Sequence, residues 1–293
     1  MSEVQNIQWF PGHMAKTRRL ISQSLKLVDA VAEIIDARIP VSSRNPELAG
    51  IIANKPLIVI LNKSDLADPD GNAAWVQYFK SRGNSAITVD CKTGKGLNAF
   101  KPAVMELLKD KLERYKSKGM VGKPLRLMVV GIPNVGKSSF INRMARNAKA
   151  KVEDRPGVTR GNQWYSIDRQ LELLDTPGIL WPKFEDPLVG ERLAFTGAVK
   201  DDVVDIETLA VRLISCLKPD YANLLESWYK VTLRDLSDYE ILCEIARRRG
   251  MLSRGGEADT ERAAAILLDE FRSGKLGRIT LELPEMYTEE ENA

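Results

Sequence analysis

The feature that most constrains this 293-residue chain is the segment Gly131-Ile-Pro-Asn-Val-Gly-Lys137-Ser138. It follows an apolar run from Leu125 to Val130 and opens a helical pattern, the order typical of a phosphate-binding loop. Glycines let backbone N–H groups wrap phosphates, Lys137 can reach the β/γ oxygens and Ser138 can ligate Mg²⁺. An ordinary glycine turn is the alternative, which the position between strand and helix disfavours. The predicted nucleotide contacts of the loop are Asn134, Val135, Gly136, Lys137, Ser138 and Ser139.

Short apolar, β-rich runs alternate with helical stretches up to about residue 175. This alternation predicts an α/β fold in which helices cover both faces of a doubly wound, six-stranded, mainly parallel sheet. A lysine-rich stretch from Lys109 to Lys123 is interpreted as a helix end and a loop within that sheet. The predicted strands are Ala30 to Ile35, Pro56 to Leu61, Ala86 to Val89, Leu125 to Val130, Gln163 to Ile167 and Leu171 to Leu174.

Beyond Pro187 the strand signal disappears and helix signals replace it. Ser237-Asp-Tyr-Glu240 predicts a capping box for a helix that ends near Gly250. A second helix is predicted to begin at Asp259 and end at Gly274. We therefore expect a nucleotide-binding domain over residues 1–180 and an all-helical domain over residues 185–293.

Asn62-Lys63-Ser64-Asp65 follows a predicted strand at its carboxyl end, where open α/β sheets bind ligands. The Asp65 carboxylate can accept hydrogen bonds from guanine N1–H and the 2-amino group, which adenine cannot supply. Asn62 can reach guanine N7, and Lys63 can lie along the base. Together with the phosphate loop, the tetrapeptide predicts GTP and GDP rather than ATP. A solvated turn that caps a helix is the alternative.

Three further segments complete the predicted nucleotide site. Asp90-Cys91-Lys92 can present a backbone N–H to guanine O6, although a turn without a ligand is also open. Asp175-Thr-Pro-Gly178 can hold Mg²⁺ through Asp175 and the γ-phosphate through the Gly178 N–H. Thr159 is either a second hydroxyl ligand of Mg²⁺ or a plain loop residue. The predicted Mg²⁺ ligands are thus Ser138, Thr159 and Asp175.

The motif order resembles the circularly permuted Ras-like GTPases, and among them the ribosome biogenesis GTPase A (YlqF-type) family. Trp9-Phe-Pro-Gly-His-Met14 and Asp36-Ala-Arg38 match as well, and the resemblance covers about residues 7 to 180. One departure is that Asp90-Cys91-Lys92 replaces the usual Ser-Ala-Lys, which leaves the backbone role of Cys91 intact and puts a side-chain role of Asp90 in doubt. The resemblance implies a cytosolic GTPase that helps the large ribosomal subunit mature, with rRNA and ribosomal proteins as partners.

The expected catalytic residues are His13, Lys137, Thr159 and Gly178. Ile179 follows Gly178 and cannot orient water, so His13, the only histidine, is a candidate for that role. A histidine that contacts RNA or caps a helix is the alternative. Asn134 can hold K⁺ beside the β/γ oxygens, in the manner of potassium-stimulated GTPases, or can simply shape the loop.

Arg247-Arg-Arg249 and Arg254 form a candidate phosphate-binding cluster, with Tyr221, Trp228, Tyr229 and Phe271 as aromatic candidates. Basic residues at a helix end also simply offset the helix dipole. Leu209, Leu213 and Leu217 have helical spacing and are predicted core residues.

Composition leaves these interpretations open. The net charge is only +3, so any basic surface must be local. Three scattered cysteines favour neither a disulfide framework nor a zinc site, and the apolar runs are too short for a membrane span. We expect a cytoplasmic monomer that does not bind membranes.

The segment after Gly178 runs directly into the helical domain, which suggests a switch. In this hypothesis GTP orders Thr159 and Gly178, hydrolysis releases them, and the helical domain is repositioned on RNA. The alternatives are a GTP-gated switch that binds a non-ribosomal protein or a membrane, and a nucleotide-binding scaffold that scarcely hydrolyses GTP.

Overall fold

The computed structural model describes residues 14–52, 55–120, 122–147, 151–153, 163–178, 186–199 and 205–287, with only the backbone described for 14–17, 49, 147 and 151–153. The chain divides into two compact units. The described residues of 9–182 and 282–293 form one, called here the sheet unit, and those of 183–281 form the other, called the helical unit.

In the described residues, the sheet unit contains a seven-stranded sheet with the order β3-β2-β1-β4-β7-β6-β5. The five strands from β3 to β7 in this order are parallel, and β6 and β5 add an antiparallel edge. All six predicted strands are present. The seventh, β5, is a three-residue edge strand without an apolar run. The strands are β1 (Ala30–Asp36), β2 (Leu57–Asn62), β3 (Ser85–Thr88), β4 (Leu125–Val130), β5 (Lys151–Glu153), β6 (Gln163–Asp168) and β7 (Leu171–Asp175).

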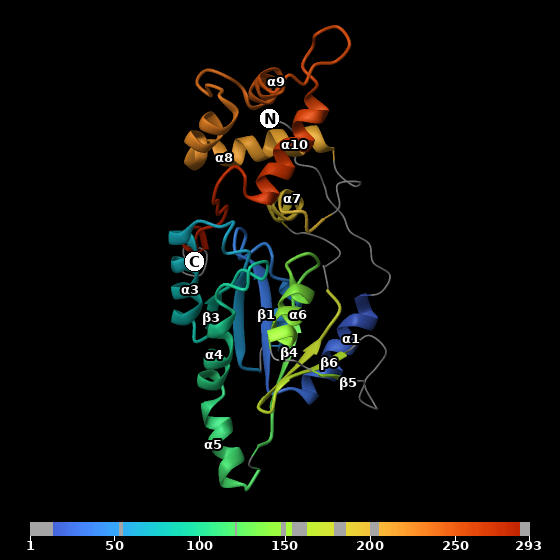
Figure 1. The fold of residues 1–293 in the computed structure, drawn as a ribbon, viewed down its shortest axis with the longest axis vertical. Coiled ribbons are helices and arrows are strands. Elements are labelled where there is room, and N and C mark those ends of the chain that lie inside the picture. Colours follow the sequence, from blue (N-terminus) through green and yellow to red (C-terminus); the bar gives the residue numbers. More distant parts are fainter. Residues whose placement is uncertain are drawn as a thin grey trace. The chain divides into compact units, whose positions relative to one another are not determined.

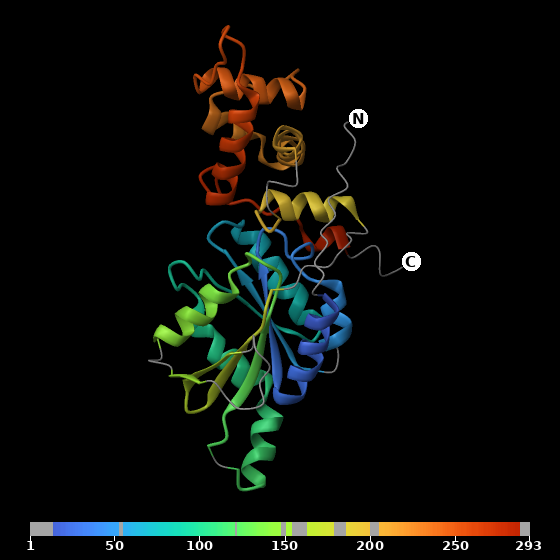
Figure 2. The ribbon, with the colours of Figure 1, turned by 90° about the vertical axis from the view of Figure 1, so that its right-hand side faces the viewer.

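Helices cover both faces of the sheet, which confirms the doubly wound α/β fold (Figures 1 and 2). On one face, α1, α2 and α3 contribute to two apolar clusters that share Leu57 of β2. On the other face, Phe100 of α4 and Phe140 of α6 meet with ring centroids 5.0 Å apart. The helices are α1 (Met14–Ser24), α2 (Pro46–Ile52), α3 (Pro69–Ser81), α4 (Phe100–Leu107), α5 (Lys109–Ser117) and α6 (Lys137–Asn147).

The helical unit contains α7 (Pro187–Phe195), α8 (Ile206–Tyr229), α9 (Asp238–Arg248) and α10 (Thr260–Ser273). The predicted capping box at Ser237 and Glu240 starts α9. Asp259 caps the start of α10, and Gly274 ends it in the left-handed conformation, as predicted. The predicted core leucines of α8 are buried. None of the described helices is both long and apolar enough to cross a bilayer.

The segment after the helical unit differs from the prediction, which placed it in the helical domain. Glu282 and the one-turn helix η4 (Pro284–Tyr287) belong to the sheet unit. The fully buried Glu282 carboxylate accepts hydrogen bonds from the Val41 N–H at 2.6 Å and from the N–H and hydroxyl of Ser42. The Glu282 carbonyl accepts one from the Trp75 indole at 2.7 Å. These contacts join residues more than 200 positions apart, so no local pattern could reveal them.

We predict that Glu282→Gln lowers the free energy of unfolding by about 1–3 kcal/mol, because an amide cannot accept all the hydrogen bonds that converge on this buried carboxylate. Thermal and denaturant unfolding of the nucleotide-free protein measures the loss. Glu285→Gln, at an exposed glutamate of the same segment, is the control and should change stability little. Equal stability of the two variants would contradict the assigned role.

Candidate nucleotide-binding site

Four loops carry the predicted chemistry and follow the carboxyl ends of the parallel strands β2, β3, β4 and β7, and the loop with Asp36 and Arg38 follows the carboxyl end of β1. Parallel strands place these ends at the same edge of the sheet. The chain runs from β1 outward to β2 and β3, then returns to the other side of β1 with β4. The predicted base-binding and phosphate-binding loops therefore lie on opposite sides of β1, although the base-binding loop comes first in the sequence.

Asn62 joins three of these loops. Its side-chain amide donates to the Val135 carbonyl of the phosphate loop at 2.7 Å, and its side-chain oxygen accepts from the Cys91 N–H at 3.1 Å. Asn62 is 3% exposed, so water competes little for these bonds. The three segments proposed to hold guanine and phosphate are thus held to one another directly. The predicted contacts with guanine N7 and O6 would use the same Asn62 side chain and the same Cys91 N–H that already make these bonds.

Gly136 is required by this arrangement. Its φ of 100° lies in the left-handed region, and an added Cβ would lie 2.2 Å from the Asn62 side-chain nitrogen. Asn134, with φ 61°, is exposed in the same loop, and α6 starts at Lys137. Ser138 and Ser139 are exposed in the first turn of this helix. Backbone N–H groups at such a turn suit an anionic ligand.

Lys63 is held at the base-binding end by an ion pair. Its φ is 60°, and its ammonium lies 2.9 Å from the carboxylate of Asp36, at the end of β1. Arg38 binds the same carboxylate through two hydrogen bonds, at 3.0 and 2.8 Å. Burial alone would raise the pKa of Asp36, but the charges and hydrogen bonds of Arg38 and Lys63 hold it well below its usual range. The sequence marked Asp36 and Arg38 only through the family resemblance; their role is to fix Lys63.

Asp65 is exposed at the next turn, where its carboxylate is accessible to a ligand. The backbone of this turn is held by two bonds to Ser64. The Ser64 N–H donates to the Val89 carbonyl at 3.1 Å, and the Asn72 side chain donates to the Ser64 carbonyl at 3.0 Å.

Asp90 has a definite side-chain role. Its carboxylate accepts from the N–H groups of Lys92 at 2.7 Å and Thr93 at 3.2 Å, and from the Thr93 hydroxyl. Burial would raise the pKa of Asp90, but these hydrogen bonds keep it below its usual range. Asp90 therefore shapes the turn that carries Cys91, whose thiol is buried and has its pKa raised to about 12 by desolvation.

Arg143 of α6 supports the same turn and was not found from the sequence. Its guanidinium donates to the Cys91 carbonyl at 3.2 Å and to the Lys92 carbonyl. The helix that begins at the phosphate loop is thereby bonded to the turn proposed to contact guanine O6. A lone arginine in a helix gives no sequence signal for such a contact.

At the predicted phosphate end, the buried Lys137 and the half-buried Asp175 carry opposite charges that influence each other. Lys137 is 9% exposed and donates to the Ile132 carbonyl at 3.3 Å. Burial lowers the pKa of Lys137, against the effect of Asp175, and burial raises the pKa of Asp175, against the effect of Lys137. A bound triphosphate would stabilise the Lys137 cation, and a divalent cation would stabilise the Asp175 anion. The donor set therefore fits a nucleotide with Mg²⁺.

Gly178 lies directly against Lys137 and the phosphate loop. An added Cβ would lie 2.7 Å from the Lys137 ammonium and 3.2 Å from the Pro133 backbone nitrogen. Just before it, the Thr176 hydroxyl donates to the Val129 carbonyl of β4 at 2.7 Å. The structure thus brings Lys137, Asp175 and Gly178 together. His13 and Thr159, the other predicted catalytic residues, lie outside the described residues.

Comparison with known proteins identifies the family. The family described as 50S ribosome-binding GTPase matches residues 126–230. Ribosome biogenesis GTPase A of Bacillus cereus is 45% identical over 97% of this chain and 96% of its own, and that of Priestia megaterium is 48% identical over 95% and 97%. A solved structure titled GNP-bound YlqF from Thermotoga maritima has 28% identity and a TM-score of 0.64 over 92% of this chain and 99% of its own.

The chain belongs to the ribosome biogenesis GTPase A family. It is a circularly permuted P-loop GTPase that hydrolyses GTP and functions in ribosome biogenesis. The loops described above are therefore the candidate GTP site of this family member. Like other GTPases, such a protein binds GTP and GDP, typically with Mg²⁺.

The predicted phosphate-binding cluster of the helical unit is only partly free for ligands. Tyr229 and Phe271 are buried core residues, which corrects their interpretation as nucleic-acid contacts. Arg249 stacks on Trp228 and Tyr229, with centroid distances of 5.7 and 5.2 Å, and also pairs with Glu270 at 3.3 Å.

The other members of that cluster differ in their surroundings. Arg247 and Arg248 are exposed beside Glu244, at 3.5 and 3.0 Å, and such surface pairs are weak. Tyr221 is half-buried and donates its hydroxyl to the Thr280 carbonyl at 3.1 Å. Arg254 is exposed.

For the GTP site of this GTPase A family member, we predict that Asn62→Ala lowers the unfolding free energy of the nucleotide-free protein by about 1–3 kcal/mol, because the Val135 carbonyl and Cys91 N–H lose their partner. GTP affinity should fall at least about tenfold. Denaturant unfolding and nucleotide titration measure the two effects. Asn72→Ala, which removes a buried side chain that donates to the Ser64 carbonyl of the predicted base-binding turn, should leave the phosphate loop in place and weaken GTP binding less.

Proposed function

We propose that this GTPase acts in maturation of the large ribosomal subunit, with direct contact to rRNA. The observation that supports this most is the extent of the 50S ribosome-binding GTPase family match. The match runs from β4 through the phosphate loop and Asp175 to just past the end of α8 in the helical unit. It therefore includes both the segments proposed to contact the γ-phosphate and the first two helices of the unit proposed to contact RNA. We place this activity in the cytoplasm and the chain as a monomer.

Within the site, we assign guanine recognition to Asn62, Lys63, Asp65 and the Cys91 backbone. The exposed Asp65 carboxylate and the fixed Lys63 ammonium support this assignment. Lys137 and the N–H groups of the phosphate loop hold the β- and γ-phosphates. Ser138, Asp175 and Thr159 hold Mg²⁺, which offsets the negative charge that develops during phosphoryl transfer.

Two proposals concern the chemical step. Ile179 cannot orient water, so His13 takes that role as a polar group in a glycine-hinged segment. Asn134 holds K⁺ beside the β/γ oxygens, which its exposed position in the phosphate loop supports. In this proposal, His13 and Asn134 act beside the phosphate groups that Lys137 and Gly178 hold.

The proposed switch links hydrolysis to the helical unit at both of its chain connections. One connection begins after Gly178, which lies against Lys137. The other ends at Glu282, which binds Val41 and Ser42 in the loop after Asp36. In the same loop, the Ser43 hydroxyl accepts from the Asp36 N–H at 3.0 Å, and Asp36 fixes Lys63. A change at either end of the nucleotide therefore has a short route to the helical unit.

We predict that purified large ribosomal subunits stimulate GTP hydrolysis, because a partner that binds the GTP state orders the switch segments. Steady-state phosphate release, with and without large subunits, measures the effect, and small subunits at equal concentration are the control. Equal, slow rates under all three conditions would favour the alternative, a GTP-gated switch for a non-ribosomal protein. No turnover under any condition would favour a scaffold.

We also predict faster hydrolysis in KCl than in NaCl at the same ionic strength, on the order of tenfold, because a bound K⁺ neutralises developing charge. Asn134→Ala should remove this difference and retain the slow rate seen in NaCl. Equal rates in the two salts for the unaltered protein would mean that Asn134 only shapes the loop.

A further inference from the structure

The segment from Lys109 to Lys123 is a concentration of positive charge in the sheet unit. Its 15 residues contain six lysines and arginines and two acidic residues, a net charge of +4, whereas the whole chain carries +3. The segment comprises α5 and the loop that leads into β4. None of the residues of α5 is fully buried, so this charge is presented to solvent.

One side of α5 is fixed to the sheet by Asp29, which directly precedes β1. Lys111 pairs with the Asp29 carboxylate at 2.5 Å, and the Tyr115 hydroxyl donates to it at 3.1 Å. The other carboxylate oxygen accepts from the Arg126 N–H at 2.8 Å. Asp29 thus neutralises Lys111 and orients Tyr115. Its carboxylate does not compensate the other lysines and the arginine of the segment.

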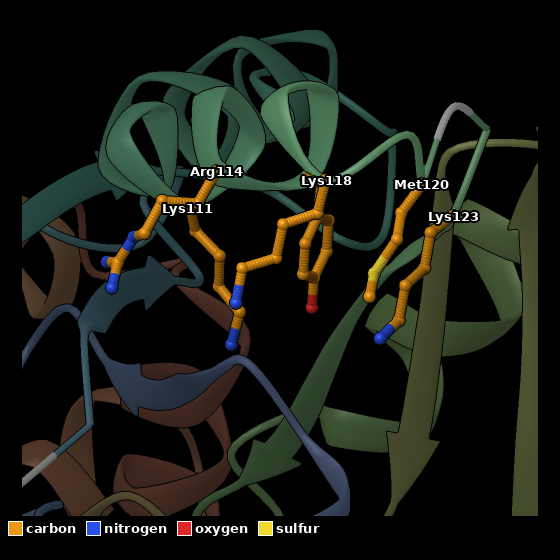
Figure 3. A pocket seen from close by; sticks show the side chains of 6 residues that line it. Lys111, Arg114, Lys118, Met120 and Lys123 are labelled. Carbon is orange, nitrogen blue, oxygen red and sulfur yellow. The ribbon is translucent and has the colours of Figure 1, made fainter.

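Arg114, Lys118 and Lys123 are exposed, and within the described residues none of them pairs with a carboxylate. With Lys111, Tyr115 and Met120 they line a single opening. Figure 3 shows the labelled cationic side chains extending from α5 and the following loop into this opening. Lys123 lies over the Tyr115 ring, 4.7 Å from its centroid, so the ring helps to hold this cation in place.

We propose that this surface, called here the α5 basic surface, binds the phosphate backbone of ribosomal RNA. The inference rests on the proposed ribosomal function and adds a second RNA contact, in the sheet unit itself. Arg114, Lys118 and Lys123 line one opening and pair with no carboxylate among the described residues, which suits a ligand with repeated phosphates better than a single small anion. Leu112 and Tyr115, the two apolar side chains of α5, are half-buried, and Met120 is the one exposed large apolar side chain that lines the opening, which is too little apolar surface for insertion into lipid.

The location allows RNA and nucleotide to bind at the same time. α5 and its loop lead into the amino end of β4, whereas the phosphate loop follows the carboxyl end of the same strand. The six residues of β4 separate the two ends by about 20 Å. RNA on the α5 basic surface would therefore hold the sheet unit in place without covering the GTP site (Figure 1).

The test replaces Arg114, Lys118 and Lys123 together by alanine in the full chain and measures binding to transcribed large-subunit rRNA at several salt concentrations. We expect weaker binding and a salt dependence reduced by about 2–3 in log–log slope, since each of the three lost phosphate contacts contributes about 0.7–0.9. The matched control replaces Lys26, Lys80 and Arg82, three exposed cations elsewhere in the sheet unit, by alanine. It should retain the original slope, and both variants should keep the basal rate of GTP hydrolysis.

Three outcomes would overturn the proposal. An unchanged slope in the Arg114, Lys118 and Lys123 variant would show that the α5 basic surface does not bind rRNA. Stimulation by large subunits would still support the proposed function in that case. Unchanged rRNA binding with weaker binding to intact subunits would identify an acidic protein as the ligand. An equal loss of slope in the matched control would show that net charge alone governs binding. Absence of stimulation by subunits is a separate result and would count against the proposed function itself.

Discussion

A single buried amide, that of Asn62, holds the proposed base-binding and phosphate-binding halves of the candidate GTP site together. It bonds to a carbonyl 73 residues away and to an N–H 29 residues away. These bonds depend on the spatial order of strands rather than on their succession along the chain. Because parallel strands present their carboxyl ends at one edge, β2, β3 and β4 bring their loops together in a permuted chain. Gly136 provides the close approach that the amide requires.

The two ends of the site differ in how their lysines are compensated. At the base-binding end, Lys63 and Arg38 share the Asp36 carboxylate, whose pKa is held far below its usual range. At the phosphate end, burial lowers the pKa of Lys137 and raises that of Asp175, so desolvation opposes both charges. The uncharged guanine base suits the base-binding end, where the charges already compensate one another. A polyanion with a divalent cation stabilises both charges at the phosphate end.

The helical unit is connected to the sheet unit on both sides in sequence, and both connections end beside the nucleotide loops. Gly178 contacts the phosphate loop, and Glu282 is buried against the loop that follows Asp36. The chain returns to the sheet unit after α10 instead of ending in the helical unit. The proposed switch uses this return as the second of its two connections to the helical unit.

The sequence alone determined the strands, the phosphate loop, the base-binding tetrapeptide and the helix caps at Ser237 and Asp259, because these features depend on neighbouring residues. It gave no signal for β5, whose three edge residues have no apolar run. Tertiary structure alone decided the second role of Asn62, the support from Arg143 and the burial of Glu282. It also placed basic side chains of α5 and the following loop around one opening, in a segment that the sequence indicated only as a connection. Each of these depends on which distant backbone groups the sheet topology brings within hydrogen-bonding or packing distance, and local sequence does not encode that proximity.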